Sequence, residues 1–342
     1  MSDPLPLLPT SVVGSHALPG WFHWAQEGVK QDKFGRLDLR ELYNDAVDLA
    51  ILDQERAGVD VIWDGEMRRY NFIMGFYDRM LGFQVGETPR KLGPYFYDAN
   101  PLQHIVGKIS APEGLGVIEE FTYLRQHTAR RLKAPLPGAL TLLTPTVLKS
   151  GYKDKESIVA DLVTILNREC KNLVAASCDF IQIDEPAFDS WFHTAPRLVV
   201  DIFNQTVAGV NAKIAIHICF GNQAGRARDP RSYAPFLKHM RDLKAEQFVL
   251  EFANREMSEL DLWYDTLPER ELAAGVVDVK NFHRESPEEV AGRIRQVLKV
   301  VPAEKLWIVP DCGFNQSPRW WTMAKLNAMV AGARIVRAEL SA

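Results

Sequence analysis

Short runs rich in β-branched residues alternate with longer amphipathic stretches along almost the whole chain. This alternation is typical of α/β proteins, in which helices cover a mostly parallel sheet. Predicted strands are Ser11–Gly14, Val59–Trp63, Ala139–Leu143, Phe180–Ile183, Lys213–Ile218, Gln247–Phe252, Gly275–Val279 and Leu306–Val309. Predicted helices are Leu39–Ala57, Lys155–Ala176, Ala195–Val210, Tyr233–Leu243, Glu259–Thr266, Pro287–Val300 and Pro318–Ala338.

Strands that are each followed by a helix fit the (β/α)8 TIM barrel, which we predict as a single domain over residues 1–342. The region from about residue 67 to 135 does not fit one strand–helix unit, so we predict an insertion after the second strand. An open doubly wound sheet is the alternative. Gly14-Ser15-His16 lacks the G-x-G-x-x-G phosphate turn of such sheets, which favours the barrel.

Composition and charge narrow the class of partner. The 342 residues are 46% hydrophobic and 25% charged, which is ordinary for a soluble globular protein. A net charge of −4 gives no electrostatic reason to expect nucleic acid or an anionic membrane as partner. The sequence shows no secretory signal and no apolar run of ~18 residues, so we expect a cytoplasmic protein with reduced cysteines.

Residues able to do chemistry stand at the carboxyl end of nearly every predicted strand. They are Ser15-His16, Asp64-Gly65-Glu66, Asp184-Glu185-Pro186, His217-Ile218-Cys219, Glu251, Asp278-Val279-Lys280 with His283 close behind, and Asp311-Cys312-Gly313. The strand ends of an α/β barrel converge on one face, where active sites form. We therefore expect these side chains to meet in a single pocket.

His217 and Cys219 stand two residues apart on a predicted strand, so their side chains point to the same side. With Glu251 and Cys312 they would make a four-coordinate site whose donor set favours zinc. Two thiolates and a carboxylate would leave the zinc electron-rich and poor at activating water. Such a centre can instead hold an incoming thiol as its thiolate, ready to attack an alkyl carbon.

Several candidates also have a structural interpretation. Cys170 and Cys178 fit small buried core residues, and Glu185, which precedes a proline, fits a structural role. Glu66 and Asp184 could hold the ammonium group of an amino-acid substrate, or they could cap helices and pair with arginines.

Two further features stay open between function and structure. His283 could be a general acid, because its charge changes near neutral pH, or an ordinary exposed loop histidine. Aromatic side chains could form a lid or line an apolar pocket for a bulky donor, or they could pack in the core. They are Trp320-Trp321, Tyr70, Phe72, Phe76 and Tyr77.

Taken together, the segments resemble the C-terminal catalytic domain of cobalamin-independent methionine synthase, in the family's order from about residue 8 to 338. The matching segments are Val13-Gly14-Ser15, Asp64-Gly65-Glu66-Met67, Ile181-Gln182-Ile183-Asp184-Glu185-Pro186-Ala187, His217-Ile218-Cys219-Phe220-Gly221-Asn222, Glu251, and Pro310-Asp311-Cys312-Gly313-Phe314. The resemblance implies a (β/α)8 barrel that binds zinc and homocysteine. It implies zinc ligands at His217, Cys219, Glu251 and Cys312, and homocysteine-binding residues at Ser15, Glu66 and Asp184.

The chain departs from the family's pattern at two points. It has about half the length of the full enzyme, whose second barrel helps to hold a polyglutamylated methylfolate. Lys280 occupies the place of a family histidine, and His283 lies three residues further on, so we predict these two as the catalytic residues. Some short homologues are similar to methylcorrinoid-dependent methionine synthases, and others to epoxyalkane:coenzyme M transferases.

Our first hypothesis is a zinc-dependent methyltransferase that makes methionine from homocysteine. The methyl donor is methylfolate or a methylcorrinoid, and whether a partner protein delivers it is left open. The alternative is thiol addition to an epoxide, but a sulfonate thiol would need arginine or lysine rather than Glu66 and Asp184. A third hypothesis, a structural zinc, conflicts with the carboxylate ligand, because structural sites are usually all Cys and His.

Overall fold

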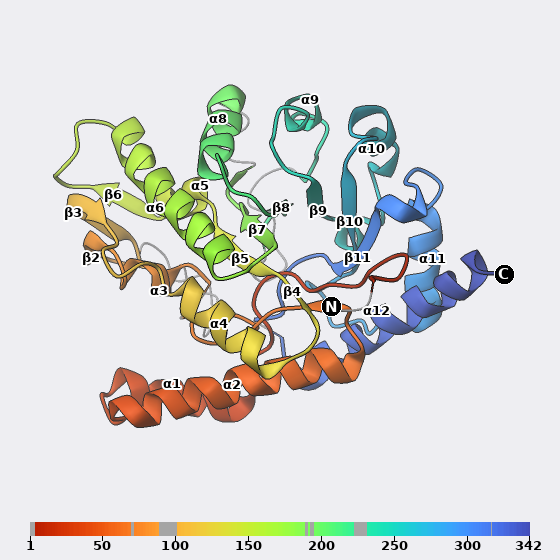
Figure 1. Cartoon of the computed structure of the whole chain (residues 1–342), viewed down its shortest axis with the longest axis horizontal. Helices are drawn as coiled ribbons and strands as arrows, with labels where there is room; N and C mark the ends of the chain where they lie inside the picture. Colours follow the sequence, from red (N-terminus) through yellow and green to blue (C-terminus); the bar gives the residue numbers. More distant parts are fainter. Residues whose placement is uncertain are drawn as a thin grey trace. The chain divides into compact units, whose positions relative to one another are not determined.

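The computed structural model describes residues 4–69, 72–88, 101–188, 191, 195–221, 231–315 and 317–342. The chain forms two compact units. Figure 1 labels their helices and strands. Unit 1 comprises Met1–Arg68, Glu120–Lys133 and Val249–Ala342, and unit 2 comprises Arg69–Glu119 and Ala134–Phe248. Among the described helices, none combines the length and apolar character needed to cross a membrane.

Unit 1 is built from strands and helices drawn from three parts of the sequence. Its strands are β1 (Val61–Ile62), β4 (Arg131–Leu132), β9 (Gln247–Glu251, which begins in unit 2), β10 (Glu271–Val277) and β11 (Leu306–Pro310). Its helices are α1 (Gly20–Lys30), α2 (Arg36–Ala57), α4 (Val117–His127, which begins in unit 2), α10 (Leu260–Thr266), α11 (Pro287–Val297) and α12 (Arg319–Leu340), with the 3-10 turns η1 (Ala253–Arg255) and η2 (Ala303–Lys305).

The strands of unit 1 pair in parallel. β10 lies between β9 and β11, and the β10–β11 pair is parallel. Thr10 bridges Ile308 of β11, Ser11 bridges Val61 of β1, and β1 pairs in parallel with β4. The segment predicted as strand Ser11–Gly14 is therefore not a regular strand. Isolated bridges at Thr10 and Ser11 connect this part of the chain to β11 and β1.

Unit 2 contains a parallel sheet and a smaller mixed sheet. Its strands are β2 (Leu81–Val85), β3 (Gln103–Ser110), β5 (Ala134–Pro137), β6 (Thr146–Leu148), β7 (Phe180–Asp184) and β8 (Lys213–Ile218). Its helices are α3 (Met74–Tyr77), α5 (Ala139–Leu143), α6 (Lys155–Ala175), α8 (Pro196–Thr206) and α9 (Leu237–Met240). β5, β7 and β8 are parallel neighbours, whereas β3 pairs antiparallel with β2 and parallel with β6.

Local signals explain where the long helices begin. Asp154 precedes α6 and accepts a hydrogen bond from the Ser157 amide, which satisfies one of the helix's unpaired first-turn donors. Before α11, Ser286 and Glu289 form a reciprocal capping box around Pro287. Each device contributes about 1 kcal/mol to helix stability, and both can be recognised in the sequence.

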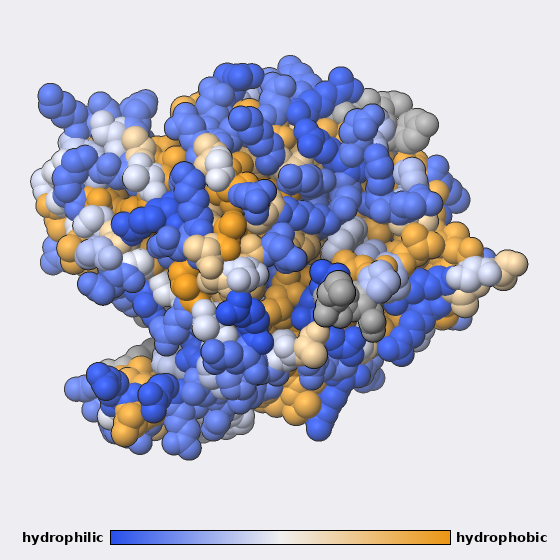
Figure 2. Space-filling view, in the orientation of Figure 1, coloured by the Kyte–Doolittle hydropathy of each residue, from blue (hydrophilic) through white to orange (hydrophobic). Residues whose placement is uncertain are grey.

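The core consists of apolar strands covered by the inner faces of the helices. Every residue of β7, β9 and β11 is buried, as expected for parallel strands packed on both faces. Each such leucine, isoleucine or phenylalanine stabilises the fold by about 1.5–3 kcal/mol. On the face shown in Figure 2, hydrophilic side chains predominate and apolar ones lie among them. The most exposed large apolar side chains among the described residues are Trp24 and Phe282.

The prediction of a strand at Ala139–Leu143 is wrong. That segment is helix α5, and the strand is β5, five residues earlier. The amides of Leu140 and Thr141 donate to the Glu185 carboxylate, which satisfies the first turn of α5 from more than 40 residues away. Alanine and leucine favour helix once that cap is present. The prediction for Tyr233–Leu243 was also too long, because the regular helix is only α9.

The region predicted as an insertion, residues 67–135, contains α3, β2, β3, α4 and β4 in its described part. Its aromatic run Gly93-Pro94-Tyr95-Phe96-Tyr97 lies outside the described residues, as does Tyr70.

Candidate active site

Strand β8 carries two of the predicted metal ligands. His217 lies in the strand and Cys219 one residue beyond its end, and both are buried. The parallel register of β7 and β8 sets Asp184 opposite His217, and the Glu185 amide donates to the His217 carbonyl at 2.9 Å. This register therefore brings a predicted substrate carboxylate beside a predicted ligand.

Three of the predicted ligands come together in the structure. His217, Cys219 and Cys312 offer ligand atoms that all lie within 4.8 Å of one another. One imidazole and two thiols are donors that zinc prefers, and the group is compact enough to hold one ion. In the part of the chain that the structure describes, this is the group of side chains suited to a metal, and it does not include Glu251.

Glu251 ends β9 and is fully buried, and its carboxylate has a different partner. The Lys280 ammonium donates to Glu251 Oε2 at 2.5 Å, and neither side chain is exposed. Lys280 was predicted as a catalytic residue, and its contact with a predicted metal ligand could not be foreseen from the spacing of the two residues. A buried ion pair of this kind is costly to break, because one charge would be left without compensation.

The segment that carries Lys280 is held by a network around Asp278. The Lys280 amide donates to Asp278 Oδ1 at 2.7 Å, and Asn254 donates to Asp278 Oδ2 at 3.0 Å. Lys325 donates to the Asp278 carbonyl and to Glu285, both at 2.6 Å. These contacts fix the backbone from which the Lys280 side chain reaches Glu251.

Asp311 was predicted only as one of the strand-end residues, without a role of its own, and its carboxylate binds backbone amides in the structure. Its carboxylate accepts hydrogen bonds from the amides of Phe252, Ala253 and Asn254, at 2.9, 3.0 and 2.6 Å. Burial, and then the charge of Glu251, raises the pKa of Asp311 well above its ordinary value. Asp311 therefore ties the backbone that follows Glu251 to the loop that carries Cys312.

A glycine makes room for that carboxylate. A Cβ at Gly275 would lie 2.2 Å from Asp311 Oδ1 and 2.8 Å from its Cα. Glycine inside an otherwise apolar strand is the sequence signal that could have indicated a close approach at this point.

Ser15 and Glu66, two of the predicted substrate residues, are in direct contact. The Ser15 hydroxyl donates to the Glu66 carboxylate, and both side chains are buried. Gly65 and Glu66 both have positive φ, at 73° and 57°, and the Glu66 amide donates to Asp64. A non-glycine residue in this conformation is uncommon and concentrates at functional sites.

The loop of Ser15 packs tightly against the loop of Cys312. A Cβ at Gly313 would lie 2.7 Å from the Ser15 nitrogen, so only glycine allows this approach. The Phe314 amide also donates to the Ser15 carbonyl at 2.7 Å. The Ser15–Glu66 pair and a predicted metal ligand therefore lie on adjoining loops.

Three further predicted residues, Asp184, Glu185 and His283, each contact neighbouring side chains or backbone groups. Gln182 donates to Asp184 at 2.6 Å. Glu185 caps α5, as its structural interpretation predicts, and burial raises its pKa to about 7. His283 is 55% exposed, and its Nε2 lies 2.9 Å from Glu289.

The two cysteines predicted as core residues are indeed buried. Burial raises the pKa of both Cys170 and Cys178 to about 12, so neither is a ready thiolate.

His16, which follows Ser15, belongs to a buried polar cluster. Its Nε2 lies 3.1 Å from Asp53, and Arg319 binds the same carboxylate through two hydrogen bonds of 2.5 and 2.6 Å. Burial opposes ionisation of Asp53, but the hydrogen bonds from His16 and Arg319 outweigh it and lower the pKa of that carboxyl.

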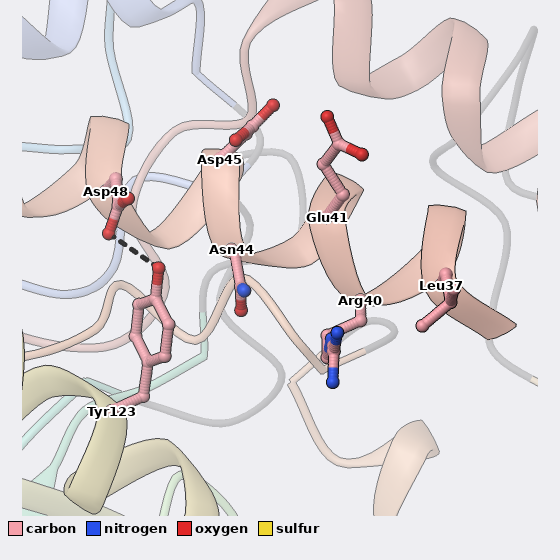
Figure 3. Close-up of a pocket in the computed structure, with 7 residues that line it drawn as sticks. All are labelled: Leu37, Arg40, Glu41, Asn44, Asp45, Asp48 and Tyr123. Atoms are coloured by element: carbon pink, nitrogen blue, oxygen red, sulfur yellow. Dashed lines mark hydrogen bonds between the residues drawn. The ribbon is translucent and has the colours of Figure 1, made fainter.

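A separate hollow of about 490 Å³ lies on the surface of unit 1, along α2 (Figure 3). At one end of its lining, the Tyr123 hydroxyl of α4 donates a hydrogen bond of 2.9 Å to Asp48 of α2 (Figure 3). Its lining contains no predicted site residue, so the chemistry lies elsewhere. The lining residues are Leu37, Arg40, Glu41, Asn44, Asp45, Asp48 and Tyr123.

Comparison with known proteins identifies a family. Residues 8–335 match the model of the catalytic domain of cobalamin-independent synthase. Methionine synthase of Saccharolobus solfataricus is 37% identical over 345 residues, which cover 98% of this chain and 97% of that protein. Methionine synthase of Thermococcus kodakarensis is 36% identical over 338 residues, with 98% and 96% covered.

A solved structure is similar over the same extent. It is the B12-independent methionine synthase from Shewanella sp. W3-18-1 in complex with selenomethionine, with a TM-score of 0.84 and 29% identity, covering 98% of this chain and 99% of that chain. This likeness confirms the predicted fold class, an α/β fold of the TIM-barrel type.

Proposed function

Because the chain belongs to the family of the cobalamin-independent methionine synthase catalytic domain, a family of homocysteine methyltransferases, we propose that it transfers a methyl group to the thiol of homocysteine, with zinc as cofactor. The observation that carries the zinc proposal is the compact group of His217, Cys219 and Cys312. We propose one catalytic barrel over residues 1–342, with residues 67–135 as an insertion.

In this proposal His217, Cys219 and Cys312 hold the zinc, and Glu251 is the fourth ligand. Zinc in such a site supplies a positive centre that binds the substrate thiol in its thiolate form at neutral pH. The thiol proton leaves to solvent. The burial of His217 and Cys219 supports the proposal, because a water-poor site strengthens charge interactions and protects the thiolate.

Ser15, Glu66 and Asp184 are proposed to hold the amino-acid end of homocysteine. Glu66 and Asp184 are buried carboxylates whose hydrogen bonds to Ser15 and Gln182 fix their positions. An ammonium group would compensate their charge through charge-assisted hydrogen bonds. The selenomethionine in the Shewanella structure is a ligand of the same amino-acid class.

The methyl group then moves by in-line displacement. The bond between the methyl carbon and the donor breaks as the bond from carbon to the homocysteine sulfur forms, and the bonding electrons stay with the donor. Holding both reactants aligned supplies much of the rate enhancement. The donor is methylfolate or a methylcorrinoid, and with methylfolate the departing nitrogen needs a proton. Lys280 and His283 are the predicted candidates for this proton donor, and because Lys280 binds Glu251 we propose His283.

The decisive experiment supplies purified protein with zinc, homocysteine and either methylcobalamin or methylfolate, and measures methionine. Methionine formed with one donor supports the proposal and identifies that donor. C312S should lose bound zinc and activity together. The matched control is C170S, which alters a buried cysteine outside the metal group and should retain both. If the zinc-loaded protein makes no methionine with either donor, the proposed reaction is wrong.

A parallel reaction with 2-mercaptoethanesulfonate and a short epoxyalkane tests the alternative substrate class. The carboxylates of Glu66 and Asp184 should repel the sulfonate, so we expect no thioether product.

A further inference from the structure

We propose that Lys280 is a positioning residue that draws the Glu251 carboxylate away from the metal and so keeps one coordination position available to the substrate thiol. This inference rests on the proposed function and deepens it, because it assigns Lys280 a role toward one of the proposed metal ligands.

Three observations about the pair support the proposal. Lys280 Nζ lies 2.5 Å from Glu251 Oε2, and both side chains are completely buried. The compact group of potential metal ligands contains His217, Cys219 and Cys312, but among the described residues it takes in no carboxylate. Glu251 therefore has a cationic partner on one of its oxygens, Oε2, and that partner competes with a metal for the negative charge of the carboxylate.

The charges of the proposed site indicate why Glu251 would need a cationic partner during ligand exchange. One divalent zinc, two thiolates and one carboxylate sum to a charge of about −1. A carboxylate that left the metal inside a buried site would need compensation, since an unpaired buried charge is costly. The Lys280 ammonium supplies that compensation. If the substrate thiolate replaced the carboxylate and the thiol proton went to solvent, the charge around the metal would be unchanged.

The Lys280 side chain is prepared for this role by the fold. Its backbone amide is bound to Asp278, and Asp278 is held by Asn254 and by Lys325. The ammonium is therefore fixed at the distance of a hydrogen bond from Glu251 before any ligand arrives. A flexible surface lysine would pay side-chain entropy to reach the same place.

The test measures zinc affinity and homocysteine affinity on the same variants. The variant is K280M, which keeps the apolar stem and removes the charge. We expect its zinc affinity, measured by competition with a chromophoric chelator, to rise by about tenfold, because Glu251 would lose its competing partner and a buried positive charge beside the metal would be removed. Homocysteine affinity, followed by the visible spectrum of the cobalt-substituted protein, should fall by about tenfold, because the displaced carboxylate would lose its compensating charge.

The proposed role predicts that K280M raises zinc affinity and lowers homocysteine affinity. A residue that only oriented Glu251 toward the metal, or only supported the fold, would weaken zinc binding when removed. A fall in zinc affinity in K280M would therefore overturn the inference. The matched control is K133M, which removes another buried lysine, one that binds the Val12 carbonyl and lies outside the Asp278 network. It should lower stability toward urea and leave zinc affinity within about twofold.

A double-mutant cycle separates the pair from a general field effect. In an E251Q background, K280M should no longer change zinc affinity, because the lysine acts through the carboxylate. An undiminished effect in E251Q would contradict the proposal. Failure of the proposed function would be distinct, since the wild-type protein would then bind no stoichiometric zinc or gain no sulfur ligand from homocysteine.

Discussion

Asp311→Ala should destabilise the protein strongly, although Asp311 is not a proposed ligand. The substitution leaves the amides of Phe252, Ala253 and Asn254 buried without their acceptor. An unsatisfied buried donor costs about 1–3 kcal/mol, so three of them cost about 5 kcal/mol. Removing the Asp311 carboxyl also removes its unfavourable burial beside Glu251, which offsets part of that cost. We therefore expect the free energy of unfolding to fall by about 3 kcal/mol.

Asp311→Asn separates the hydrogen bonds from the charge. Its amide oxygen can still accept from Phe252 and Ala253, while its amide nitrogen opposes the Asn254 amide. Only one of three bonds is lost, so we expect about 1–2 kcal/mol. The order Ala, then Asn, then wild type should therefore appear in increasing stability.

The assay is urea unfolding of the metal-free protein in a chelator, followed by circular dichroism, with the dependence on urea unchanged between variants. Metal-free protein is used so that a change in zinc binding does not add to the result. The control is Asp242→Ala, which breaks an exposed ion pair with Arg197 and should cost less than about 1 kcal/mol. If Asp311→Ala costs no more than this control, the assigned role of Asp311 is refuted.

Three further predictions concern other buried groups. Gly275→Ala should lower the free energy of unfolding by about 2 kcal/mol, because its Cβ would lie 2.2 Å from an Asp311 oxygen; an unchanged urea midpoint would contradict this. The pKa of Glu185 is raised from 4.5 to about 7, so the folded state holds its proton more tightly than the unfolded state. Stability should therefore be fully present below pH 4.5 and fall by about 3 kcal/mol as pH rises through 7, and Glu185→Gln should remove that slope. In the native metal-free protein at pH 8, a thiol reagent should modify half-buried Cys312 first, whereas Cys170 and Cys178 should react only after unfolding; early modification of either core cysteine would contradict their burial.

Much of the fold could be predicted from periodicity, because most strands and long helices are stabilised by patterns within their own segments. β7, β8 and β11 are continuous apolar runs, and α6 and α11 carry their own caps. The prediction for α5 was wrong because the sequence of that segment alone does not decide its structure. Its five residues read equally well as strand or helix, and the choice depends on Glu185, which lies more than 40 residues later.

Some features of the candidate site could likewise be predicted from local sequence, whereas others depend on contacts between distant segments. Residue type and spacing were enough to predict His217, Cys219 and Cys312 as one metal group, because thiols and imidazole at barrel strand ends have few other uses. Spacing could not show that Glu251 would bind Lys280, or that Asp311 would bind the backbone after Glu251. Both contacts depend on which side chain reaches which neighbour once the strands are paired.

The contact between Lys280 and Glu251 matters for the proposed exchange of a carboxylate ligand for the substrate thiol. A site defined only by its donors would hold zinc in four fixed bonds, and a closed site of this kind is structural. The Lys280–Glu251 pair gives one carboxylate a second buried partner at 2.5 Å. A carboxylate with two competing partners can leave one without becoming an uncompensated charge. In the role that we propose for Lys280, this pairing would make Glu251 the ligand that gives way to the thiol.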